Sequence, residues 1–150
     1  MITQTKISFS DIKLKNLLIF NSNVEISQFA TVVFARIISA RDEQNQEIQN
    51  QIEKIRLECV DTKLAQILLQ ANQSLMQVNT FTVEIIADNK ALLSQINIDS
   101  LQNQNINLAN AAIALKWVSK FGSGSYSALK LVIDINDFIK NNYKNERENN

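Results

Sequence analysis

The sequence predicts an all-α fold, a helical bundle with one or more long amphipathic, coiled-coil-like helices. Two observations carry this prediction: the chain contains no proline and only two glycines, and its apolar residues recur mostly at intervals of three and four. Proline and glycine disfavour helices most, and this spacing places apolar side chains on one helix face. We expect residues 1–143 to form a single helical domain and residues 144–150 to be a polar, frayed tail.

Composition narrows the classes of function. Lys plus Arg and Asp plus Glu each total 15, and no long segment is strongly basic, so we expect no nucleic-acid partner. The chain has no histidine, which removes histidine-activated nucleophiles and histidine-containing metal sites. The single cysteine, Cys59, is expected to be a buried core thiol. We therefore predict a non-enzyme with no catalytic residues, cofactor or metal.

The N-terminal part shows two capping-box patterns, in which a Ser and an acidic residue stand three positions apart. Ser8 with Asp11 predicts a helix that ends near Phe20, and Ser22 with Glu25 predicts a second helix over residues 26–40. This second segment is too short to cross a bilayer. The N-terminus lacks the pattern of a cleaved signal peptide, so we expect a cytoplasmic protein or one exported without such a peptide.

Residues 41–51 are polar, with Ile48 as the only apolar residue, and allow two interpretations. In the first interpretation, the helix continues through these residues as an exposed segment. In the second, a connection near Asp42 to Asn45 lets two helices fold back on each other. We favour continuation, because most of these residues are acceptable helix formers and no Gly or Pro interrupts them.

The next segment shows two apolar seams at helical spacing, which predict a helix with more than one neighbour. The first seam comprises Ile52, Ile55 and Cys59. The second, a candidate partner-binding surface, comprises Val60, Leu64, Ile67, Ala71, Val78, Phe81 and Ile85. The pattern fits a helix buried inside one bundle and a helix shared between protomers equally well.

The C-terminal part is expected to hold two more helices. A boundary at residues 97–105 precedes a helix over residues 106–121, and a last helix covers about residues 127–143. Between them, the Gly-Ser-Gly-Ser run at residues 122–125 is interpreted as a tight connector between antiparallel helices, ahead of a functional hinge or an engineered joint.

Few residues suggest a binding or catalytic site. The carboxylate pairs at helical spacing are Glu84 with Asp88 and Asp134 with Asp137. We favour solvated helix faces for both pairs over cation binding or acid–base chemistry. Trp117 and Tyr126 flank the connector, and we favour a role in capping the core over lining a pocket or partner surface.

The sequence therefore predicts a non-catalytic protein for interaction, structure or assembly, acting through packed amphipathic helices and forming an oligomer with itself or another helical protein. The alternative is a membrane-active helical protein such as a toxin component, whose weakly charged helices over residues 26–40 or 106–118 leave the bundle to enter lipid.

Overall fold

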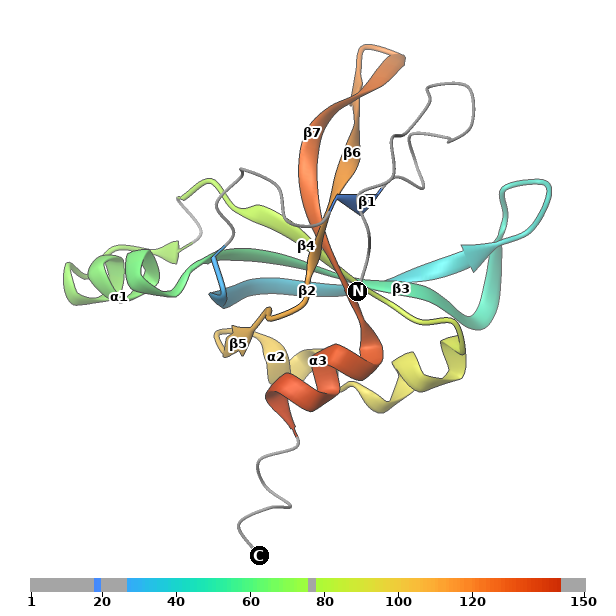
Figure 1. Cartoon of the computed structure of the whole chain (residues 1–150). Helices are drawn as coiled ribbons and strands as arrows, with labels where there is room; N and C mark the ends of the chain where they lie inside the picture. Colours follow the sequence, from blue (N-terminus) through green and yellow to red (C-terminus); the bar gives the residue numbers. More distant parts are fainter. Residues whose placement is uncertain (1–17, 20–26, 76–77, 144–150) are drawn as a thin grey trace, which may run out of the picture.

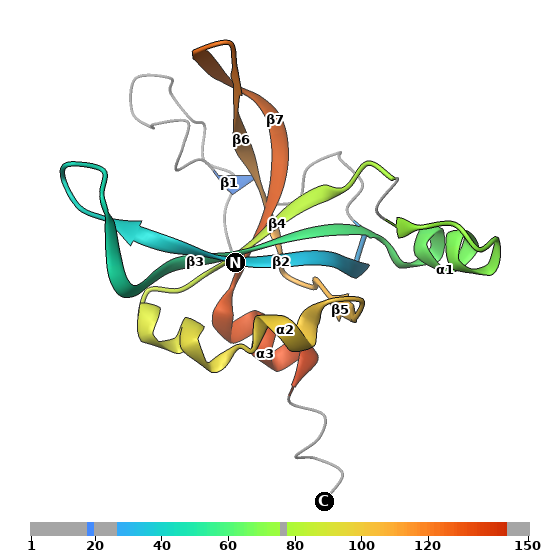
Figure 2. The same ribbon diagram turned by 180° about the vertical axis from the view of Figure 1, so that it is seen from behind.

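The protein is built around a curled, mixed β-sheet of seven strands (Figures 1 and 2). The structure, a computed structural model, describes residues 18–19, 27–75 and 78–143. The longest helix among these residues has nine residues. The predicted all-α fold is therefore wrong, and so are the helical bundle and the coiled coil.

The sheet contains one parallel pair, β4 with β7, and is otherwise antiparallel. Its strands are β1 (Leu18–Ile19), β2 (Phe29–Arg41), β3 (Glu47–Asp61), β4 (Phe81–Ile86), β5 (Asn105–Asn107), β6 (Ala112–Lys120) and β7 (Ser123–Asp134). They lie in the order β1-β6-β7-β4-β3-β2-β5. The helices are α1 (Thr62–Gln70), the 3₁₀ helix η3 (Lys90–Gln95), α2 (Ile98–Leu101) and α3 (Ile135–Asn142).

Alternation along β3 explains how this sheet divides into two faces. Ile55, Leu57 and Cys59 are buried on one face, while Arg56 and Glu58 point to the other. Successive side chains of a strand point to opposite faces, so a period of two separates apolar from charged residues. Strand β4 continues both rows, because its Val83 pairs with Leu57 and its Glu84 pairs with Arg56.

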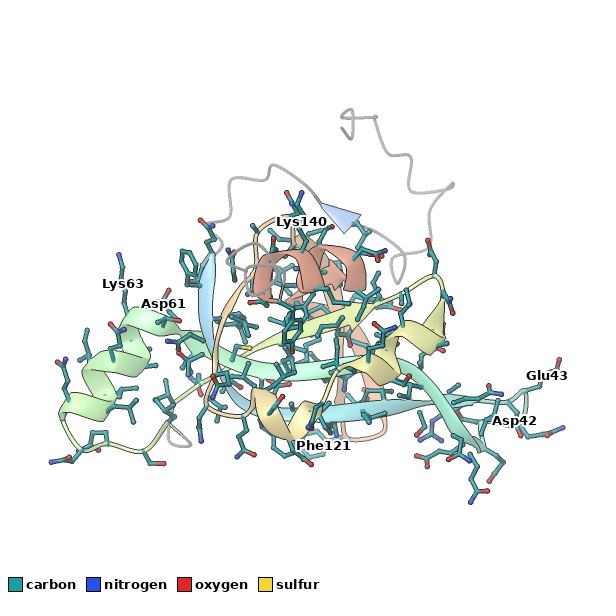
Figure 3. The ribbon with its side chains drawn as sticks, turned by 90° about the horizontal axis from the view of Figure 1, so that it is seen from below. Asp42, Glu43, Asp61, Lys63, Phe121 and Lys140 are labelled. Atoms are coloured by element: carbon teal, nitrogen blue, oxygen red, sulfur yellow. The ribbon has the colours of Figure 1, made fainter. Side chains whose placement is uncertain are left out.

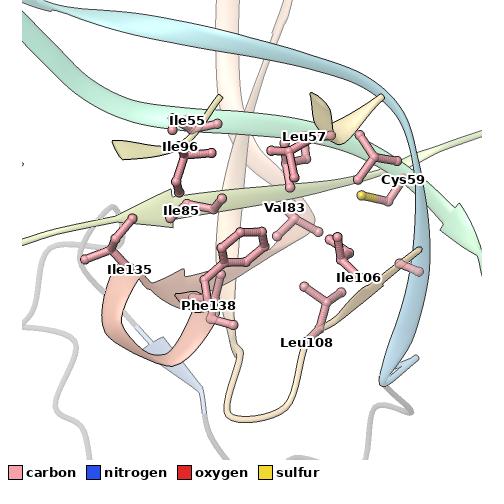
Figure 4. Packing of buried hydrophobic residues seen from close by; sticks show 14 of the residues in the cluster. Ile55, Leu57, Cys59, Val83, Ile85, Ile96, Ile106, Leu108, Ile135 and Phe138 are labelled. Carbon is pink, nitrogen blue, oxygen red and sulfur yellow. The ribbon is translucent and has the colours of Figure 1, made fainter. Parts of the chain in front are cut away.

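The apolar face of the sheet forms the main core under the helices (Figures 1 and 4). Phe138 of α3 is fully buried against it, and Leu93 of η3 and Leu101 of α2 close the same cluster. Asp134 caps α3 by accepting a hydrogen bond from the amide of Asn136, which sets where β7 ends and the helix begins.

Asparagine supplies most of the left-handed backbone positions for which glycine is usually needed. Among the described residues, five of the six non-glycine residues with positive φ are asparagines: Asn45, Asn50, Asn72, Asn103 and Asn110. Asn visits the left-handed region more readily than most residues because its short polar side chain bonds to nearby backbone. A chain with two glycines can therefore still turn often enough to build a sheet.

In the N-terminal half, the described part of the helix predicted over residues 26–40 is mostly strand β2, which begins at Phe29. Residues 41–51 contain the turn between β2 and β3, where the Asp42 side chain accepts hydrogen bonds from the amides of Gln44 and Gln46. The favoured interpretation, a helix that continues through residues 41–51, is therefore wrong. The alternative, a connection near Asp42 to Asn45, is present, but it joins two strands rather than two helices. Figure 3 shows Asp42 at the tip of this hairpin. The first predicted helix and the capping box at Ser22 lie outside the described residues, except that Leu18–Ile19 form β1.

In the C-terminal half, the helix predicted over residues 106–121 is replaced by parts of β5 and β6 with a short connection between them. The connector predicted at residues 122–125 is only partly correct: Gly122 lies in the turn between β6 and β7, but Ser123, Gly124 and Ser125 belong to β7 and pair with β6. Of the last predicted helix only Ile135–Asn142 is helical, and its first part belongs to β7.

Candidate functional site

The polar face of the sheet carries a pocket of about 440 Å³, which we call the cationic pocket. It lies among β3, β4, β6 and β7, and Figure 1 shows the β6–β7 hairpin extending away from the helices that cover the opposite face. Its polar lining includes Lys54, Arg56, Thr82, Glu84, Lys116 and Lys130. A volume of several hundred Å³ is typical of sites for small ligands.

Glu84 lines this pocket and is only 2% exposed. Three cations from two neighbouring strands surround its carboxylate. The distances are 2.9 Å from Lys54 Nζ, 3.0 Å from Arg56 Nη2 and 2.6 Å from Lys130 Nζ. The register explains why these cations meet Glu84. Arg56 lies directly opposite Glu84 on β3. On β7, Glu84 pairs with Val132, and Lys130 is two residues before Val132, on the same face of the strand.

The cations keep Glu84 ionised. Burial by itself would raise the pKa of this carboxyl, but hydrogen bonds and charge attraction from Lys130 and Lys54 outweigh burial and lower the pKa from 4.5 to about 2. The side chain is therefore a fixed negative charge at neutral pH.

Lys116 adds a fourth cation to the pocket with a different set of contacts. Its ammonium donates a hydrogen bond to Thr82 Oγ1 at 2.8 Å, and the Thr82 hydroxyl in turn donates to Glu58 at 3.0 Å. Within the described part of the chain, no carboxylate lies within ion-pairing distance of Lys116. Its charge is thus balanced only indirectly.

The charges around the pocket do not cancel. Four cationic side chains line the pocket, and three of them pair with Glu84, while Lys116 reaches Glu58 only through Thr82. The other carboxylate of the lining, Glu53, is paired with Lys90 at a half-exposed site. The pocket therefore has a net positive charge in a chain whose total charge is zero.

Two aromatic residues line one side of the pocket. Trp117 of β6 and Tyr126 of β7 are paired in register, and their rings meet edge to face with centroids 5.1 Å apart. A register shift in the β6–β7 ladder falls between Lys116 and Trp117, and both of these consecutive residues line the pocket. Neighbouring side chains of a regular strand point to opposite faces, and a register shift can redirect one of them. The shift therefore explains how Lys116 and Trp117 both line the pocket.

The sequence-predicted carboxylate pairs are not brought together on helix faces. Glu84 lies on β4, whereas Asp88 is exposed beyond the end of that strand. Asp134 is the N-cap of α3, and Asp137 lies in the first turn of that helix. Glu84 is therefore the one member of either pair that enters a candidate site, and it does so as an ion-pair partner.

The predicted partner-binding seam is distributed over three elements rather than along one helix. Val60 is the last buried residue of β3, and Phe81 and Ile85 belong to β4. Leu64 and Ile67 are exposed on α1, and Ala71 follows this helix. Val78 packs against a small apolar cluster that includes Ala65 of α1. Only Phe81 and Ile85 pack in or against the main core. Whether any of these residues binds a partner stays a prediction.

Cys59 confirms the expectation of a buried core thiol. It is fully buried in β3, and burial, reinforced by the nearby charge of Glu58, raises the pKa of its thiol to about 12. A thiol with this pKa stays protonated and unreactive at neutral pH.

Other kinds of site find no support in the described part of the chain. Its His, Cys, Asp and Glu side chains form no group of three or more able to hold a metal ion. No helix in it has the length and apolar character to cross a membrane. Comparisons with protein-family models, curated proteins and solved structures find no match to this chain. The cationic pocket is therefore the strongest candidate site in the described residues.

Proposed function

We propose that this protein is a non-catalytic binding protein that holds an anionic group of its ligand, a phosphate or a carboxylate, in the cationic pocket. The observation that carries the proposal is the set of four cations, Lys54, Arg56, Lys116 and Lys130, that line a pocket whose one buried carboxylate, Glu84, pairs with only three of them. The expectation of a protein that acts by binding is retained, but the binding surface is now a sheet face.

The burial of these cations supports the proposal. Their side chains are 16% exposed in Lys130, 24% in Lys54 and 26% in Arg56. Removing charge from water is costly unless the charge is paired, and Glu84 offers one negative charge to three cations. A ligand anion would supply the missing charge at a place where water screens it weakly.

The geometry favours binding over catalysis. The functional groups facing the pocket are cations held by ion pairs or hydrogen bonds and an ionised carboxylate with three cationic partners. Such a carboxylate is a poor general base, because its pKa is held near 2. The absence of enzymatic activity stays a prediction.

The membrane-active alternative loses its stated mechanism. The segments at residues 26–40 and 106–118, which were expected to leave a bundle as helices, contribute to strands β2, β5 and β6. Self-association or contact with a helical partner stays a prediction.

Calorimetric titration with inorganic phosphate and with citrate at constant ionic strength tests the proposal. We expect saturable binding of at least one of these anions to one site per chain. In Lys116→Gln the affinity for the bound anion should fall about five-fold or more, because the charge-assisted hydrogen bond from Lys116 to the anion is lost. The ion pairs of Glu84 do not involve Lys116.

A matched control is Lys63→Gln, which removes a cation from the exposed face of α1 (Figure 3). Its affinity should equal that of the unmodified protein. Failure of both anions to bind, or equal losses in the two variants, would overturn the proposal.

A further inference from the structure

Trp117 is held in one orientation by three contacts. Its Nε1 donates a hydrogen bond to Ser119 Oγ at 3.2 Å, and its ring packs edge to face against Tyr126. The indole also lies against the backbone of Gly124, where a Cβ atom would come within 2.5 Å of three ring atoms. Glycine at this position therefore makes room for the ring.

Despite these contacts, Trp117 is 52% exposed. An aromatic side chain that is both fixed and half exposed offers a flat apolar surface, and little conformational entropy is lost when a ligand covers it. The core does not require this exposed surface, since the main apolar cluster lies on the opposite face of the sheet.

The exposed indole and the cations belong to one cavity. Trp117, Lys116 and Lys130 all line the cationic pocket, whose volume of about 440 Å³ suits a small molecule. Stacking on an aromatic ring combined with cationic contacts to phosphate is the way that proteins hold nucleotide units without reading their sequence.

We propose that the ligand of the cationic pocket is a small molecule that joins a planar ring to a phosphate, as a nucleoside monophosphate does. The ring stacks on Trp117, and the phosphate lies against Lys116 and Lys130. This inference rests on the proposed function and adds the ring as the second recognised group. A volume of about 440 Å³ has room for a single nucleotide, so we propose a free nucleotide rather than a nucleic-acid strand.

Calorimetric titrations with adenosine monophosphate, inorganic phosphate and adenosine separate the two contacts. We expect adenosine monophosphate to bind about ten-fold or more tightly than either half, because stacking adds to the phosphate contact. Since Trp117 is the only tryptophan, its fluorescence should be quenched with the same saturation curve.

In Trp117→Leu, the affinity for adenosine monophosphate should fall to that for phosphate, while phosphate affinity stays unchanged. The control is Phe34→Leu, which alters an exposed aromatic residue of β2 outside the pocket and should change neither affinity. If Trp117→Leu does not fold, the fluorescence titration of the unmodified protein still tests the stacking contact.

Three results would overturn the inference. Phosphate binding with no gain from the nucleoside would refute the ring contact and leave the proposed function standing. No binding of any anion would refute both. A single-stranded oligonucleotide that binds about ten-fold more tightly than adenosine monophosphate would assign the site to nucleic acid instead.

Discussion

At the residue scale, Glu84 is the side chain on which the polar face of the sheet depends. Removing it would leave Lys54, Arg56 and Lys130 close together and largely buried without their shared partner. Breaking a buried ion pair by removing one member typically costs about 3–5 kcal/mol. We predict a loss of this size in the free energy of unfolding for Glu84→Ala, measured by urea denaturation at neutral pH.

The control for this variant is Glu53→Ala. Glu53 pairs with Lys90 at a half-exposed site, and such pairs contribute about 0–1 kcal/mol. Equal urea midpoints for the two variants would show that the ion pairs of Glu84 add nothing to stability.

The same carboxylate predicts how stability depends on pH. Folding lowers the pKa of Glu84 from 4.5 to about 2, so the folded state favours the ionised form. The resulting stabilisation is fully present above pH 4.5 and is lost as the pH falls toward 2. Urea titrations across this range should therefore show a steeper loss of stability in the unmodified protein than in Glu84→Gln. Parallel curves would contradict the lowered pKa.

At the scale of single elements, burial distinguishes two leucines on neighbouring elements. Leu57 of β3 is fully buried, whereas Leu64 of α1, which the predicted seam placed in a packing surface, is 40% exposed. Truncating a buried Leu costs about 2–5 kcal/mol through lost transfer energy and a residual cavity.

We therefore predict a loss in that range for Leu57→Ala and less than about 1 kcal/mol for Leu64→Ala, because substitutions at exposed positions usually have small effects. Thermal or urea unfolding of both variants checks the difference. A larger loss for Leu64→Ala would favour the helical seam over the sheet.

The turn between β6 and β7 carries backbone strain that a substitution should remove. Phe121 has a φ of 51°, is fully exposed, and precedes Gly122, whose φ is 81°. Two-residue hairpin turns of this shape favour Asn-Gly. We predict that Phe121→Asn raises the free energy of unfolding by about 1 kcal/mol, whereas Phe121→Val lowers it. A loss of stability in Phe121→Asn would show that the Phe ring makes a stabilising contact.

The helical spacing in β3 shows why the strands were not predicted. Ile52, Ile55 and Cys59 step by three and four, so they satisfy a helical period as well as they fit a strand. Leu57, which the seam omitted, decides for a period of two, because it alternates with Arg56 and Glu58. The frequent asparagines were likewise a sign of turns, since most left-handed positions carry Asn.

At the scale of the whole molecule, the sequence predicted single features but not their assembly. The buried thiol of Cys59 and a helix near the C-terminus were predicted from local patterns, whereas only Gly122 of the connector predicted at residues 122–125 lies in a turn. Three residues of the cationic pocket were singled out from the sequence, but for other roles: Trp117 and Tyr126 as residues that cap the core, and Glu84 as part of a solvated helix face. The cationic pocket could not be predicted from local sequence patterns. Strands β3, β4, β6 and β7 all contribute to it, and long-range strand pairing determines which of their residues meet.

The parallel pairing of β4 with β7 is the feature on which both the sheet and the pocket depend. It places Val83 beside Leu131 and Ile85 beside Ile133, and it brings Lys130 to Glu84. Nuclear Overhauser spectra of the labelled protein test it directly. We predict amide-to-Hα contacts between these paired residues across the two strands. Strong sequential amide–amide contacts through residues 81–86, with no contacts to residues 131–134, would indicate a helix at residues 81–86 and contradict the parallel pairing of β4 with β7.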